Sequence, residues 1–227
     1  MSTESFGSYP NNRQENWIAY RESAEFKKGV QELEDTDELN TQVKTLLLAV
    51  ALNLKQATEF DMHSDPASER RIVKMLSNLG VYFFKDIEAS ETYKKFFGEH
   101  SMQDSDVSCY LVGSSPCALS MAIEHARPFP SNPSEDANFG KAMEFPESAI
   151  EAYGRYRESR KEGFLIDFEE PQLTEEEKAF SFFRLSSQNW EKEIEWLEQI
   201  IVGVKEYSPR IYEQVMEEHK KMIAKRP

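Results

Sequence analysis

The chain has 227 residues, of which 39% are apolar and 30% are charged, and its formal net charge is −14. This length and composition predict a single folded domain with a sizeable core, and they exclude an intrinsically disordered chain. The negative charge argues against direct binding of nucleic acid or of an anionic membrane, because both rely on a basic protein surface.

The cysteine content and the absence of long apolar runs predict the compartment. Cys109 and Cys117 are too few for a disulfide framework, which indicates a reducing environment. The N-terminus is polar and does not resemble a signal peptide, and the longest apolar run, Leu46 to Leu52, is far shorter than a membrane span. We therefore expect a cytoplasmic protein.

Residues 1–12 are predicted to be a disordered polar tail, and residues 13–227 to be one helical domain. Its N-terminal layer, residues 13–98, contains three main helices and a short aromatic helix that ends at Gly98. The second of the three is apolar nearly all round, which predicts that it forms the centre of the fold. The three main helices are expected over about Arg13 to Glu34, from a cap at Asp35 or Thr36 to Phe60, and from Asp65-Pro66 to Ile87.

The middle of the chain, residues 99–146, shows little periodicity and is predicted to be an irregular, proline-rich connector. A short helix is expected from Pro116 to Ala126, and the polar stretch from Ser131 to Asn138 is interpreted as a loop. Any β-structure is expected only within Val107 to Val112.

The C-terminal layer, residues 147–227, is the most regular part. A helix is expected from Glu147 to Arg160, and a capping box at Thr174 and Glu177 begins a long helix with an apolar seam from Phe180 to Val204. Ser208-Pro209 restarts the chain as a final helix. The fold class predicted is therefore all-α, an irregular bundle of six to eight helices.

The first candidate site is the turn Gly113-Ser114-Ser115-Pro116-Cys117, which would place Cys117 in the first turn of a helix. Free amides and the helix dipole at that position lower the pKa of a thiol and can hold an anion. The competing interpretation is that Ser115 only caps the helix and Cys117 packs as a small apolar residue. His125 would lie about 12 Å further along the helix axis, too far to act as a local base.

A metal site was weighed because all four His residues have carboxylates nearby in the sequence. None has Glu three positions before it, so the Glu-x-x-His spacing of dinuclear bundles is missing. Asp61, His63 and Asp65 alternate in a predicted loop, but such loops usually only solvate and cap. No metal and no cofactor is predicted.

The second candidate site is a protein-binding face on the C-terminal seam. Phe182, Trp196 and Ile200 make this face wider than a two-stranded coiled coil needs. They either pack inside the bundle or form a patch for a partner, in which Trp196 would be a natural anchor.

No phosphate-binding loop or common catalytic motif is present, which disfavours an enzyme without excluding one. The leading hypothesis is a non-catalytic regulatory or assembly protein that binds a protein partner, including a second copy of itself through the C-terminal helices. One alternative is a small-molecule enzyme or ligand-binding protein with its site at the turn from Gly113 to Cys117. A further alternative is an acidic nucleic-acid mimic.

Overall fold

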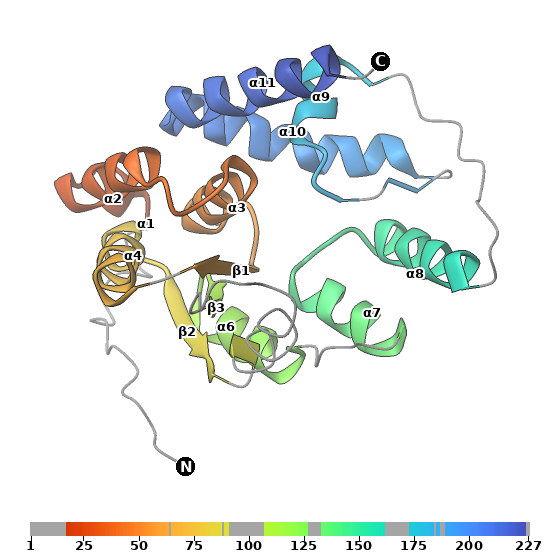
Figure 1. Cartoon of the computed structure of the whole chain (residues 1–227), viewed down its shortest axis with the longest axis horizontal. Helices are drawn as coiled ribbons and strands as arrows, with labels where there is room; N and C mark the ends of the chain where they lie inside the picture. Colours follow the sequence, from red (N-terminus) through yellow and green to blue (C-terminus); the bar gives the residue numbers. More distant parts are fainter. Residues whose placement is uncertain are drawn as a thin grey trace.

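The chain is mostly helical and contains one small sheet (Figure 1). Helices and a three-stranded sheet account for most of the part that the computed structural model describes. The predicted tail, residues 1–12, and the predicted aromatic helix before Gly98 lie outside the described residues. Those are residues 17–63, 65–87, 89–90, 107–126, 133–161, 173–183, 185–186 and 189–225.

The first helical segment is split in two, and the prediction of one continuous helix was wrong. α1 (Trp17–Arg21) is followed by α2 (Ala24–Asp35). Ser23 separates them, because its backbone is extended and its hydroxyl accepts a hydrogen bond from the Phe26 amide at 3.1 Å. That bond satisfies an amide with no partner inside the helix, so α2 begins there.

α3 (Thr41–Ala51) is capped by Asn40 and ends well before Phe60, where the sequence predicted it to stop. It is buried nearly all round, as its composition indicated. Asn53 takes a left-handed conformation, with φ of 54°, and turns the chain out of the helix.

α4 (Pro66–Leu79) begins as predicted, with Asp65 accepting from the Ala67 amide at 2.7 Å and Pro66 in the first turn. It ends at Gly80, whose φ of 73° suits a helix C-terminus, and so stops before the predicted end at Ile87.

The sheet corrects the expectation of a purely all-α fold. It consists of β1 (Ala57–His63), β2 (Tyr82–Asp86) and β3 (Val107–Gly113) in the order β1-β3-β2, with both pairs antiparallel. Only β3 was anticipated as possible β-structure. β2 and the first part of β1, as far as Phe60, occupy stretches for which the sequence predicted helix, and the rest of β1 occupies a stretch that was predicted to be a loop.

Both faces of the sheet are covered. Phe60, Tyr110 and Val112 belong to the larger core, which they share with α2, α3, α4, α10 (Trp190–Tyr207) and α11 (Pro209–Ala224). The rings of Phe60 and Tyr110 stack at 5.3 Å between centroids. The other face carries Ala57 and Leu111, which pack in a smaller cluster with residues of α6 (Pro116–Glu124) and α7 (Pro133–Ala142).

The middle of the chain is more regular than predicted. Besides β3 it contains α6 and α7, and α7 occupies much of the stretch from Ser131 to Asn138 that was interpreted as a loop. α8 (Glu147–Lys161) confirms the helix expected from Glu147 to Arg160. α7 and α8 lie side by side, to one side of the sheet (Figure 1).

The long helix predicted along the seam is broken after Phe180. α9 (Glu175–Phe180) starts with the expected capping box, in which the Glu177 amide donates to Thr174 at 3.2 Å. α10 starts only at Trp190, because Glu193 is fully buried and its carboxylate accepts from the Ser186 amide at 2.7 Å. Ser186 itself lies outside the helix.

α9, α10 and α11 form a layer that packs against α3 (Figure 1). Ser208 caps α11, accepting from the Ile211 amide at 3.2 Å, and it also donates to Glu34 of α2 at 2.6 Å. Among the described helices, none is both long and apolar enough to cross a membrane.

Candidate functional site

The turn from Gly113 to Cys117 is tightly packed. A Cβ atom at Gly113 would lie 2.6 Å from the backbone nitrogen of Leu119, so only glycine lets β3 approach α6 this closely. The Ser114 amide donates to the carbonyl of Gln56 at 2.8 Å, and Ser115 accepts from the Ala118 amide at 3.1 Å. The Ala118 amide, one of those that an anion would use at this helix start, is therefore already satisfied.

Cys117 lies in the first turn of α6, as the sequence predicted. Its side chain is exposed, so the interpretation that it packs as a small apolar residue was wrong. The described residues supply no hydrogen bond or ion pair to its thiol, so no base is in place to activate it. Cys109 is buried in β3, and burial, followed by Asp61 beside it, raises the pKa of its thiol to about 12. This second thiol therefore stays protonated.

The predicted protein-binding residues lie in two environments. Ile200 is fully buried in the larger core. Phe182 and Trp196 are half-buried and contact each other, with ring centroids 6.1 Å apart. Trp196 also packs against Phe183 at 5.4 Å and Phe145 at 6.3 Å. We call Phe145, Phe182, Phe183 and Trp196 the aromatic cluster, and its members come from two distant parts of the chain.

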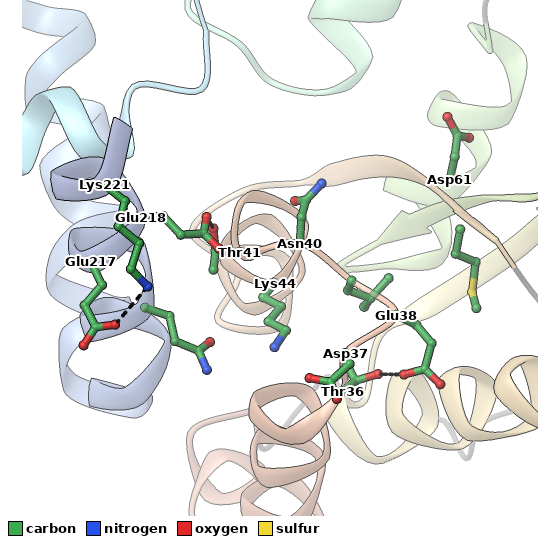
Figure 2. A pocket seen from close by; sticks show the side chains of 13 residues that line it. Thr36, Asp37, Glu38, Asn40, Thr41, Lys44, Asp61, Glu217, Glu218 and Lys221 are labelled. Atoms are coloured by element: carbon green, nitrogen blue, oxygen red, sulfur yellow. Dashed lines mark hydrogen bonds and ion pairs between the residues drawn. The ribbon is translucent and has the colours of Figure 1, made fainter. Parts of the chain in front are cut away.

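A groove that no local motif indicated runs between the N-terminal and C-terminal helices (Figure 2). Its volume is about 620 Å³ and it is open to solvent. One wall of the groove is formed by residues 36–41 and by Lys44 of α3, and the facing wall is formed by residues 214–221 of α11. Asp61 and Met62 of β1 complete the lining. We call this the acidic groove because it is lined by five carboxylates and two lysines, namely Asp37, Glu38, Asp61, Glu217, Glu218, Lys44 and Lys221.

Two of the carboxylates are fixed by neighbours. The Glu38 carboxylate accepts a hydrogen bond from the Thr36 hydroxyl at 2.5 Å and forms an ion pair with Arg71. The hydrogen bond from Thr36, followed by the contact with Arg71, lowers the pKa of Glu38 to about 2. Glu218 accepts from the hydroxyl of Thr41, which joins α11 to the start of α3. Both carboxylates thus already accept hydrogen bonds from within the protein.

Two of the other carboxylates, Asp37 and Glu217, are available to a ligand. Asp37 is exposed, and the described residues offer it no hydrogen bond or ion pair. Glu217 is exposed on the opposite wall, and Lys221 lies 3.7 Å away on the same helix. Exposed pairs of this kind exchange easily with other cations, because they contribute little stability.

Two polar groups in the groove have unused hydrogen-bonding capacity. Lys44 is 5% exposed, and its ammonium donates to the Glu34 carbonyl at 3.1 Å, the one acceptor that the described residues give it. Burial lowers its pKa from the ordinary 10.5, while Asp37 acts in the opposite direction. The side-chain oxygen of Gln214 is buried and has no donor among the described residues. Such groups suit a ligand that both accepts and donates hydrogen bonds.

The described residues contain no group of three or more His, Cys, Asp or Glu arranged to hold a metal ion. No protein-family model, curated protein or solved structure matches this chain. What the acidic groove binds is therefore inferred from its own charge and shape.

Proposed function

We propose that this protein is a non-catalytic interaction module, of a regulatory or assembly kind, which binds a cationic segment of a partner protein in the acidic groove. The observation that carries the proposal is the excess of carboxylates over lysines on the two facing walls. Asp37 and Glu217 offer free or weakly paired charges to Lys or Arg side chains of the partner.

The shape of the groove favours a protein segment over a small molecule. Small-molecule sites are mostly enclosed and apolar, with a few polar groups that orient the ligand. The acidic groove is open and mostly polar, so it would bury little of a small ligand. An extended segment could lie along it, because its peptide groups both donate and accept hydrogen bonds and so match Gln214 and Lys44.

The charge of the whole chain supports the same partner. A net charge of −14 attracts a cationic partner over a distance and speeds its association, an effect that salt weakens. It also disfavours a second copy of this chain as the occupant of the groove, because acidic surfaces repel each other. Self-association through the C-terminal helices would therefore use a different face.

Fluorescence anisotropy with a labelled oligolysine peptide tests the proposal. The double variant Asp37→Lys/Glu217→Lys should weaken binding by at least about tenfold relative to wild type. The matched control Glu191→Lys/Glu198→Lys makes the same change in net charge at exposed positions of α10 outside the groove, and should weaken binding by about twofold or less. An equal loss in both variants, or no binding by wild type, would show that the groove is not the site.

A further inference from the structure

Lys55 is a fully buried lysine that has no carboxylate partner among the described residues. It lies between α3 and β1 and is 1% exposed. Its ammonium donates to the carbonyl of Met143 and lies 4.0 Å from the ring centroid of Phe145 and 5.6 Å from that of Trp196. No described carboxylate comes within ion-pair distance of it. Aromatic faces attract a cation, but they replace its lost hydration only in part.

The same short segment makes a second bond to the same turn. The Gln56 amide donates to the Glu144 carboxylate at 2.9 Å. Glu144 has a φ of 58°, a left-handed conformation that residues other than glycine rarely adopt and that the surrounding contacts must maintain. We call residues 55–56 with residues 143–145 the clasp.

The clasp fastens α7 and α8 to the rest of the molecule. Phe139 and Met143 cover the sheet face that carries Ala57 and Leu111, so α7 is the outer cover of the smaller cluster. Beyond the turn, Ser148 of α8 donates to the buried Glu193 of α10. If the clasp opened, the aromatic cluster would lose Phe145 and the sheet would lose part of its cover.

We propose that protonation of Lys55 opens the clasp, so that acidification releases α7 and α8 from the sheet. In the closed state the ammonium is enclosed by apolar and aromatic groups, whereas in the open state water hydrates it. The charged form therefore prefers the open state and the neutral amine tolerates the closed one. Glu144 is the one charged group that acts on Lys55 among the described residues, and it favours the charged form.

The pH range of the switch follows from the two states. Burial lowers the pKa of Lys55 from 10.5 to about 7 in the closed state, with Glu144 opposing, and hydration restores the ordinary value in the open state. Between pH 10.5 and pH 7 the closed state binds fewer protons than the open state. The equilibrium constant for opening therefore rises as the pH falls through this range, and it changes little below pH 7. Between about pH 9 and about pH 6 the opening equilibrium should increase on the order of a hundredfold.

Native-state hydrogen exchange across this pH range tests the proposal, with protection factors corrected for the intrinsic pH dependence of exchange. Amides of α7 and α8 should lose protection on the order of a hundredfold towards the lower pH. At every pH they should be less protected than the amides of α3, because the clasp opens without unfolding the rest of the molecule. Lys55→Met, which is neutral at every pH, should remove the difference. Lys74→Met, at an exposed position of α4, should retain it.

Three results would overturn the proposal. The first is equal protection of the amides of α3 and those of α7 and α8 at each pH, because it would mean that all of them exchange only through global unfolding. The second is an unchanged pH dependence in Lys55→Met. The third is an NMR titration of the Lys55 ammonium in wild type that gives its ordinary pKa of 10.5, and this measurement decides the matter even where the variant does not fold.

Discussion

Replacing Gly29 by Ala tests how closely α2 and α4 pack, and it sets two opposing effects against each other. A Cβ atom at this position would lie 2.7 Å from the backbone nitrogen of Leu79 and 2.8 Å from the carbonyl carbon of Asn78. Side chains can rotate away from such contacts. Backbone atoms in a helix cannot, so α2 would have to move away from α4 as a unit.

The collision outweighs the helix-forming advantage of Ala. That advantage is about 1 kcal/mol in a helix interior. Overpacking costs about 1 to 3 kcal/mol, and a displaced α2 would also loosen Phe26 and Leu33, which are 1% and 0% exposed. We expect Gly29→Ala to lower the free energy of unfolding by up to about 2 kcal/mol after the gain in propensity is deducted.

Gly154 in α8 provides the matched control, because no atom lies within 4 Å of a Cβ added there. Gly154→Ala should therefore raise the free energy of unfolding by up to about 1 kcal/mol. Urea unfolding followed by far-UV circular dichroism measures both variants, with equal slopes showing that only stability has changed. If Gly29→Ala unfolds at the same urea concentration as Gly154→Ala, or at a higher one, the close packing of α2 on α4 is refuted.

Two further substitutions test contacts that position the acidic groove. The pKa of Glu38 in the folded protein, about 2, lies below its ordinary value of 4.5, so its stabilising effect is complete above pH 4.5 and is lost as the pH falls towards 2. In thermal unfolding, Glu38→Gln should be less stable than wild type by about 1 kcal/mol at neutral pH, and a difference that persisted in strong acid would contradict the assignment. Ser208→Ala removes the cap of α11 and the buried bond to Glu34, and should cost about 2 kcal/mol in urea unfolding, whereas a cost below about 0.5 kcal/mol would contradict this role.

Two helix starts were predictable from the sequence because capping is local, whereas the cap predicted at Asp35 or Thr36 was wrong, since Asn40 caps α3. Asp65-Pro66 and the box formed by Thr174 and Glu177 each satisfy amides within a few residues of themselves, and both begin helices in the structure. Helix ends were predicted less well. The apolar residues that continue from α3 through Phe60 fit a helix. They fit equally a strand covered on both faces, in which apolar residues do not alternate cleanly with polar ones.

The acidic groove and the clasp could not be predicted because each joins distant segments. Asp37 and Glu217 lie far apart in the sequence and meet only because α11 packs on α3. The burial of Lys55 has no sequence signal either, since a lysine next to Gln56 in a polar turn would normally be exposed. By contrast, the turn from Gly113 to Cys117 was recognised as a helix start, because its signal is local.

The order of the strands along the chain has a consequence for biosynthesis. β3 pairs with both β1 and β2, and it is the last of the three to leave the ribosome. Until residue 113 has emerged, the two earlier strands are edges without partners, and such edges are prone to aggregate. α2 and α4 pack directly on each other and can meet before then. A nascent chain that stalls before β3 would therefore carry a formed helical pair beside two open strands, which makes it a natural client for chaperones.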